Sequence, residues 1–139
     1  MILGYLIFLG SGALIKHSFK IERELKDVSL VTNGLAALIT FFKEAVNSEI
    51  ERVLSKDYQL AIARYDDVFV AIFSDIDDAM ALGLARKYVR IIGNKLRDMG
   101  IGFNMTKLDR ISTAIKDVIE KLEKEIEILN QKASEVKYI

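Results

Sequence analysis

The pattern of apolar and polar positions first predicts two strands joined by a tight turn. Residues 2–9 are almost continuously apolar, which is typical of a strand covered on both faces of a sheet. Gly10-Ser11-Gly12 then supplies small residues that tolerate positive φ, so we expect a turn and a second strand over residues 13–20. Residues 13–25 can also be drawn as a helix, and this alternative stays open at the level of the pattern.

The period then changes to that of a helix. After Asn33-Gly34, apolar residues recur at three- and four-residue spacing over residues 34–53, which indicates a helix with one apolar face. The residues expected on that face are Leu35, Leu38, Ile39, Phe42, Val46, Ile50 and Val53.

A second pair of strands is expected over residues 58–65 and 67–74, joined at Asp66-Asp67. The first of these strands alternates, whereas the second is apolar on both sides and should lie inside the sheet. Two amphipathic helices follow, over residues 78–98 and 106–136. The apolar positions expected to pack in the first of them are Met80, Leu84, Tyr88, Ile91, Ile92 and Leu96.

This order of elements predicts the α+β class. Two strands, a helix, two strands and two helices are satisfied by an antiparallel sheet of four to five strands flanked by helices, with a long C-terminal helix. We expect residues 1–102 to form an α+β domain. Residues 103–139 should form an amphipathic helix that packs on this domain, mediates dimerisation, or does both.

Composition narrows the chemistry. The chain has 51% hydrophobic and 29% charged residues, with 20 basic against 20 acidic side chains, as expected for one ordered globular domain. A net charge of zero gives no general attraction to nucleic acid, and no nucleic-acid partner is expected. The absence of cysteine excludes disulfides, thiolate metal sites and a cysteine nucleophile. We expect no cofactor and no metal.

Residues 1–15 are apolar but do not predict a membrane segment. No basic region precedes them, and the run is shorter than the roughly 20 apolar residues that a spanning helix needs. A cytoplasmic protein without an integral membrane segment is therefore expected. Abundant Glu and Lys, with two Gln and neither Pro nor Trp, favour an archaeal or thermophilic source.

Gly10-Ser11-Gly12 begins like a dinucleotide-binding loop, but the pattern stops there. The third glycine position is Ile15, where close packing of helix on strand needs a small residue, and no Walker-type Gly-Lys-Ser/Thr is present. A hairpin turn is the better interpretation. His17 is the only histidine, so a triad or zinc site lacks partners and a structural role is expected.

Asp75 and Asp77 follow an apolar strand, which is also how phosphotransferases of the haloacid dehalogenase type present their acidic residues around Mg²⁺. In those enzymes Gly-Thr follows, whereas Asp78-Ala79 follows here. Capping of the helix over residues 78–98 explains the same aspartates more simply.

Two surfaces of the predicted helices are candidate interaction sites. All charged side chains from residue 79 to residue 97 are basic, and at about 100° per residue Arg86, Arg90 and Arg97 fall within about 40° of one another. They form a solvated face or a docking strip for an acidic protein surface, anionic lipid or nucleic acid. The last helix would be about 45 Å long, so we expect its first half to pack on the domain and Leu122, Ile126 and Leu129 to contribute to a homodimer.

The segments "MILGYLIFLGSGALIKHSF" and "DYQLAIARYDDVFVAIFSD" resemble longin-like (SNARE-like, profilin-like) domains. The first is similar to their opening strand, glycine turn and second strand. The second, with Arg64-Tyr65 before two turn residues, is similar to the central hairpin of small adaptor chains and transport-complex subunits. The resemblance covers about residues 1–98, and the long last helix is an extension.

This resemblance implies a non-enzymatic interaction or assembly module, with a small GTPase or a trafficking-like complex as the partner. Exposed sheet edges and a groove beside the first helix would provide the binding surfaces. The alternative is a small-ligand sensor with a cavity between the sheet and the first helix, lined by Phe42 and Tyr58. A less favoured alternative is a Mg²⁺-dependent phosphoryl-transfer enzyme that uses Asp75 and Asp77.

Overall fold

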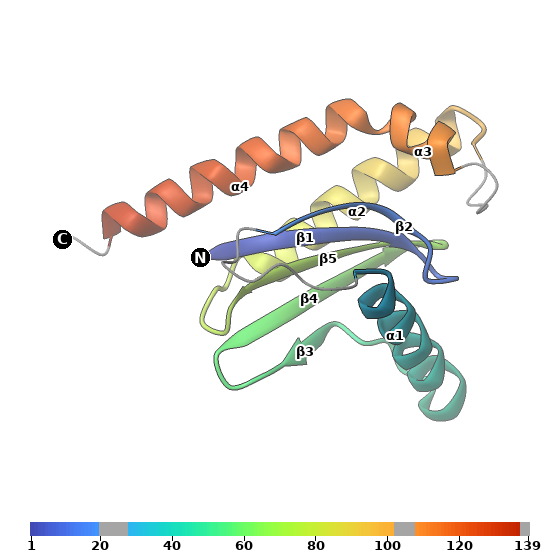
Figure 1. Ribbon diagram of the computed structural model, residues 1–139, viewed down its shortest axis with the longest axis horizontal. Coiled ribbons are helices and arrows are strands. Elements are labelled where there is room, and N and C mark those ends of the chain that lie inside the picture. The colour runs from blue at the N-terminus through green and yellow to red at the C-terminus, as the bar shows by residue number, and fades with distance from the viewer. Residues whose placement is uncertain (20–27, 102–107, 137–139) are drawn as a thin grey trace.

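The computed structural model describes residues 1–19, 28–101 and 108–136, which form one antiparallel sheet with helices on both faces (Figure 1). The five strands lie in the order β2-β1-β5-β4-β3. In chain order the elements are β1 Ile2–Leu9, β2 Leu14–Phe19, α1 Val28–Phe41, η1 Phe42–Val46, β3 Arg52–Leu54, β4 Tyr58–Tyr65, β5 Val68–Asp75, α2 Ala81–Asp98, α3 Leu108–Ala114 and α4 Lys116–Val136. The predicted α+β class with a long C-terminal helix is confirmed.

The glycine-containing segment is a hairpin turn between β1 and β2. The amide of Leu9 donates to the carbonyl of Ala13 over 2.9 Å, and Gly12 takes a φ of 93°. A Cβ at Gly12 would also lie 2.2 Å from Oδ1 of Asn33, so both the backbone and the space require glycine there. The alternative helix over residues 13–25 is wrong for its described part, Leu14–Phe19, because that part pairs with β1; residues 20–25 lie outside the described residues.

The central hairpin was predicted within one residue. β4 and β5 pair throughout, from Tyr58 opposite Asp75 to Tyr65 opposite Val68, and Asp66 in the turn has a φ of 51°. β5 lies between β1 and β4, as its apolar residues on both sides predicted.

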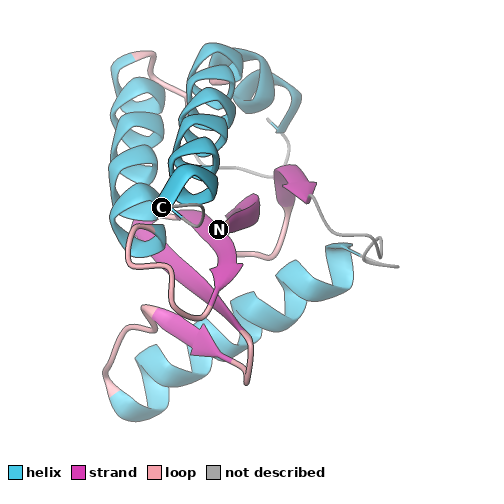
Figure 2. Cartoon of the chain, turned by 90° about the vertical axis from the view of Figure 1, so that its left-hand side faces the viewer, coloured by secondary structure: helices cyan, strands magenta, loops and turns pink. Residues whose placement is uncertain are grey.

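Alternation along the strands builds a core on each face of the sheet. On one face Tyr5, Ile7 and Leu9 of β1 pack with α2, α3 and α4. On the other, Leu6 and Phe8 pack with residues of α1 and β3. Figure 2 shows this division, with α2 and α4 together on one side of the sheet and α1 on the other.

The first helix differs from the prediction at both ends. It begins at Val28, so that Gly34 lies inside it, and its helical path ends after η1, where Asn47 takes a left-handed φ of 53°. The last part of the predicted helix is instead an extended segment that leads into the short edge strand β3. Its apolar spacing is compatible with either structure, because Ile50 and Val53 pack against the sheet without being helical.

α2 begins at Ala81 rather than at residue 78 and ends at Asp98, as predicted. Leu84, Tyr88, Ile92 and Leu96 are buried, whereas Met80 and Ile91 are exposed, so the buried face is narrower than predicted. The predicted last helix is two helices, because a break at Ile115 separates α3 from α4.

α4 is held on the sheet by apolar and polar contacts together. Val118, Ile119 and Leu122 are buried, each contributing about 1.5–3 kcal/mol by removal from water. Two tyrosines from beneath donate hydrogen bonds to its glutamates, Tyr5 to Glu123 over 2.6 Å and Tyr88 to Glu125 over 2.5 Å.

These contacts change the ionisation of the groups involved. Burial, together with the neighbouring carboxylate, raises the pKa of Tyr5 and of Tyr88 far above the ordinary value. For Glu125, burial opposes ionisation, but the hydrogen bond from Tyr88 and the ammonium of Lys87 outweigh it and lower its pKa. The two tyrosines therefore stay protonated and Glu125 stays ionised near neutral pH.

Candidate functional site

The outer edge of β4 is only partly covered by another strand. β3 pairs with Gln59, Leu60 and Ala61 of β4, and the amide of Ile62 donates to the carbonyl of Glu51 over 2.8 Å. Beyond this point the chain turns away through Ser48 and Asn47 into η1. Within the described part of the chain, Ala63 to Tyr65 therefore have no strand beside them on this edge.

A groove of about 410 Å³ lies at this uncovered edge. Its lining comes from β4 and β5, from α1 and η1 on one side of the sheet, and from α2 on the other. The apolar residues of the lining are Ile39, Ile50, Ile62, Ala63, Phe69 and Val89, and the charged ones are Lys43, Glu49, Glu51, Arg64, Arg86 and Arg90. The groove thus combines an apolar floor with a charged rim.

The basic strip predicted on α2 is only partly assembled at this groove. Arg86 and Arg90 line it, and Arg86 forms a 2.8 Å ion pair with Glu51. Arg97 is not among the lining residues; it hydrogen-bonds Asn94 over 3.3 Å and lies 5.9 Å from the ring centre of Tyr65. The three arginines therefore do not form one continuous strip: Arg86 and Arg90 lie at the groove, whereas Arg97 contacts Asn94 and Tyr65.

Most of the other cations of α2 are neutralised inside the domain. Lys87 pairs with Glu125 of α4 over 3.0 Å, and Lys95 pairs with Asp117 over 2.5 Å. The ion pair with Lys95 lowers the pKa of Asp117. Arg90 has no hydrogen-bond or ion-pair partner among residues 1–19, 28–101 and 108–136, and it is the cation of α2 that remains available to another molecule.

A second feature is the exposed apolar side of α1. From Val28 to Phe42 the chain carries no charged residue. Leu38, Phe41 and Val46, along α1 and η1, are nevertheless 38%, 58% and 56% exposed, although all but Phe41 were predicted to face the core. These three residues are called the α1 patch below. The helix α1 lies near the edge of the sheet that β3 forms (Figure 1).

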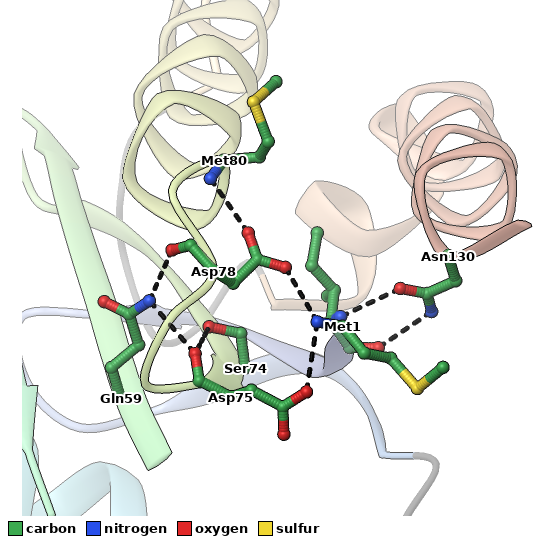
Figure 3. A network of polar contacts seen from close by, with 8 residues as sticks. Met1, Gln59, Ser74, Asp75, Asp78, Met80 and Asn130 are labelled. Carbon is green, nitrogen blue, oxygen red and sulfur yellow. Dashed lines mark hydrogen bonds and ion pairs between the residues drawn. The ribbon is translucent and has the colours of Figure 1, made fainter. Parts of the chain in front are cut away.

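The aspartates after β5 form a structural network. The N-terminal ammonium of Met1 lies 3.1 Å from a carboxylate oxygen of Asp75 and 3.1 Å from one of Asp78 (Figure 3). Burial lowers the pKa of this ammonium, but hydrogen bonds to Asp78 and Asp75 outweigh burial and raise it overall. Asp77 is exposed on the surface.

Capping of α2 by these aspartates is not what the structure shows. The helix starts after Met80, whose side chain makes no capping bond. Asp78 instead accepts a 2.8 Å hydrogen bond from the amide of Met80, ahead of the first turn, because its other oxygen is held by the terminal ammonium. The described residues contain no group of three or more acidic or histidine side chains arranged for a metal ion.

Two more side chains complete this network. The buried amide of Gln59 donates to the carbonyls of Asp75 and Asp78 over 3.2 and 2.6 Å. From α4, Asn130 accepts a hydrogen bond from the amide of Ile2 over 2.8 Å and donates one to its carbonyl over 2.9 Å. Figure 3 shows how the start of β1, the end of β5 and α4 are joined at this point.

The remaining sequence candidates have ordinary surroundings. His17 lies on β2 opposite Leu6, with its ring 6.2 Å from that of Phe19. Tyr58 lines an apolar groove of about 260 Å³ over the α1 side of the sheet, but Phe42 is not among its lining residues, so the cavity expected between them is not formed as predicted. No helix in the described ranges has the length and apolar content of a membrane span.

The residues proposed for a dimer helix contact this chain's own core. Leu122 and Ile126 are buried, and Leu129 is partly buried against the same cluster. Ile128 of α4 is a large apolar residue that is 49% exposed. A role of α4 in dimerisation stays a prediction.

Sequence reasoning missed the groove because its parts are far apart in the chain. Glu49 and Glu51 were assigned to a helix, Lys43 carried no recognisable motif, and Arg64 was noted only as part of the central hairpin. One signal was available: Arg64 occupies the same face of β4 as the apolar Leu60 and Ile62, which indicates that this face reaches the surface there.

No protein-family model matches the chain, and no curated protein matches it in sequence. Solved structures do match. An MglB in a tetrameric arrangement aligns with a TM-score of 0.58 and 7% identity, over 72% of this chain and 80% of that one.

Two further structures agree with it. A Roadblock/LC7 domain from Streptomyces avermitilis aligns with a TM-score of 0.50 and 9% identity, over 70% of this chain and 84% of the other. The gliding protein MglB from Thermus thermophilus aligns with a TM-score of 0.50 and 8% identity, over 63% and 72%. At such identities the likeness concerns the fold alone: the chain has a roadblock and longin-like fold.

Proposed function

We propose that this chain is a non-enzymatic protein–protein interaction module that binds its partner through the α1 patch and the adjoining edge of β3. The observation that carries the proposal is the α1 patch itself. A surface helix of a monomeric protein normally turns charged residues toward water, whereas α1 has none and exposes Leu38 and Phe41. Val46 of η1 is exposed as well. An apolar surface of this kind beside an open strand edge suits a protein partner.

The resemblance to longin-like domains favours two partners, a small GTPase and a second copy of this chain. The similar structures include a tetrameric arrangement of MglB, which supports assembly as the role of this fold. A second copy would cover the α1 patch with the same patch of its partner, as isologous interfaces do. A GTPase would place an apolar surface of its own there.

The test is association measured with a surface variant. We expect the parent chain to self-associate in sedimentation velocity, or to retain one of a panel of purified small GTPases. Phe41→Asp should weaken that association at least tenfold, because it places a charge in the apolar contact. Met99→Asp, which alters an exposed apolar residue just after α2, a helix on the other face of the sheet from α1, should leave it unchanged.

A third variant separates the two faces of the molecule. If Ile128→Asp abolishes self-association while Phe41→Asp leaves it intact, α4 carries the interface and the α1 patch does not. A chain that stays monomeric and binds no GTPase, but is stabilised by a nucleotide or metabolite in a thermal-shift screen, would contradict the proposal and favour a small-ligand sensor.

A further inference from the structure

The groove at the uncovered edge of β4 has the backbone geometry of a strand-binding site. Side chains alternate along β4, and so do the directions of its backbone N–H and C=O groups. Since the amide of Ile62 points outward to Glu51, the same backbone groups of Arg64, two residues on, point outward as well. Among the residues that the structure describes, no strand pairs with this part of the edge. An extended segment could therefore continue the sheet here.

The chain itself shows which side chains this edge accepts. Just before β3, Glu49-Ile50-Glu51 enters the groove in an acidic, aliphatic, acidic order. Glu49 forms an ion pair with Arg64, and Glu51 forms one with Arg86 over 2.8 Å. Ile50 packs against the core on the α1 side of the sheet. Acidic side chains thus meet arginines while the aliphatic one meets the apolar floor.

The groove remains cationic after these pairs have formed. Its lining carries four cations and two carboxylates, so the local charge is +2. Arg90 and Lys43 account for the excess, and neither has a hydrogen-bond or ion-pair partner within the described ranges. The two lie on opposite sides of the sheet edge, Arg90 on α2 and Lys43 on η1. A segment in the groove would therefore meet a cation on each side.

We infer that the groove binds an extended acidic segment of a partner protein, in which acidic and aliphatic residues alternate. Its backbone pairs with the edge of β4 at Arg64, and its aliphatic side chains enter the apolar floor on the α1 side. Alternation places its carboxylates on the opposite face, where they contact Arg90 of α2. The inference rests on the proposed function insofar as both require a protein partner. It names a different surface from the α1 patch, and a partner chemistry for that surface.

Charge complementarity favours a peptide over a nucleic acid or an anionic membrane. Glu49 and Glu51 already pair with Arg64 and Arg86, so among the described residues the groove offers only two further cations, too few for a continuous run of phosphates. The apolar floor provides aliphatic contacts that a sugar–phosphate backbone cannot use. The site is also concave and lies at a strand edge, whereas a membrane surface would need an exposed, flat basic face.

The inference is tested with a defined probe, a fluorescein-labelled seven-residue peptide in which glutamate and isoleucine alternate. Binding to the full chain is followed by fluorescence anisotropy at low and high salt. We expect binding that weakens as salt increases, because the rim cations are exposed. A peptide with lysine in place of glutamate, and one with serine in place of isoleucine, should bind at least about tenfold more weakly.

Variants then locate the site. Arg90→Glu should weaken binding about tenfold, because it reverses the cation that meets the carboxylates. Lys43→Glu should have a smaller effect, because Lys43 lies on the side that the aliphatic residues occupy. Arg110→Glu, which reverses an exposed arginine of α3, should leave binding within about twofold of the parent. Amide chemical-shift changes on peptide addition should centre on Ala63 to Tyr65, and the unchanged spectrum elsewhere shows that each variant is folded.

Several results would overturn the inference: no binding of the alternating peptide by the parent, equal losses in Arg90→Glu and Arg110→Glu, or shift changes centred on the α1 patch. Tighter binding of a thymidine oligonucleotide or of phosphatidylserine vesicles, lost in Arg90→Glu, would assign the groove to another class of ligand. These outcomes leave the proposed function intact, since Phe41→Asp tests it by partner association. Conversely, loss of peptide binding in Arg90→Glu would support the groove as a binding site even if Phe41→Asp does not change partner association.

Discussion

Replacement of Gly93 by alanine adds one methyl group where α2 lies against β4. A Cβ at this position would lie 2.1 Å from Cδ1 and 2.4 Å from Cγ of Tyr65, far inside van der Waals contact. The ring of Tyr65 is partly buried and also lies beneath the guanidinium of Arg97. The methyl group therefore forces either the ring from its place or α2 away from the sheet.

Two opposing effects determine how much Gly93→Ala changes the free energy of unfolding. Alanine in place of glycine inside a helix raises the free energy of unfolding by about 1 kcal/mol, because the unfolded chain loses backbone freedom. Overpacking of a well-filled contact costs about 1–3 kcal/mol, and a Cβ that meets three atoms of one ring belongs near the top of that range. We expect Gly93→Ala to lower the free energy of unfolding by about 1–2 kcal/mol.

Gly83 provides the matched control on the same helix. Nothing lies within 4 Å of a Cβ built at this exposed position, so only the favourable backbone effect applies. Gly83→Ala should raise the free energy of unfolding by about 0.5–1 kcal/mol. The same chemical change is thus expected to have opposite signs at two positions of α2.

Urea denaturation followed by circular dichroism measures both variants, with equal m-values as the check that the unfolded state is unchanged. Tyr65→Ala supplies the second step of a double-mutant cycle. In that background Gly93→Ala should lose its penalty, because the ring that it displaces is gone. The reasoning fails if Gly93→Ala stabilises the parent as much as Gly83→Ala does, or if its penalty persists without the ring.

Three further predictions concern the contacts that hold α4 and the start of β1. Glu125 has a folded-state pKa below its ordinary value of 4.5, so its contribution to stability is present above that pH and is lost as the pH falls through the folded-state pKa. Glu125→Gln should lower the free energy of unfolding at pH 7, and the difference from the parent should disappear once the pH has fallen below the folded-state pKa in a urea-denaturation series. Asn130→Asp replaces the donor to the carbonyl of Ile2 by an oxygen and should lower the free energy of unfolding by about 1–3 kcal/mol. Hydrogen exchange of the backbone amides in the second half of α4 should become faster. Asn130→Ser keeps a donor and should lower the free energy of unfolding by less. Gln59→Glu places a carboxylate against two carbonyl oxygens and should destabilise the fold by about 2–4 kcal/mol at pH 7. The loss should be much smaller at pH 4, where the carboxylate is more readily protonated. An equal loss at both pH values would contradict this explanation.

The central hairpin was predictable because its signals are local. The apolar run of β5 and the turn at Asp66-Asp67 lie within a few residues of one another, and alternation gives the face of each side chain. The turn at Gly12 was predictable for the same reason. These features depend on short-range sterics and on burial of one continuous run, both of which are present in the chain before it folds.

The candidate site was predictable only in part. Arg86 and Arg90 were recognised as neighbours on one helical face, which follows from the geometry of α2 alone. The sequence did not predict that Arg86 is paired while Arg90 stays available to a partner, because Glu51, which neutralises Arg86, is 35 residues away along the chain. The aspartates after β5 failed as helix caps for a similar reason: the ammonium of Met1 reaches them only after β1 has paired with β5.

The amino-acid sequence by itself determined the class of the fold, the central strands and the amphipathic helices, since periodicity and turn residues act over short distances. Tertiary structure decided which of the apolar and charged residues remain available. Leu38 is exposed and Leu122 is buried although both belong to apolar patterns. Among the described residues Arg90 is unpaired, although Lys87 on the same helix is not. The reason is physical: burial and charge pairing depend on the neighbours that distant segments bring, and the sheet has only enough area to cover some of the surfaces that the pattern offers.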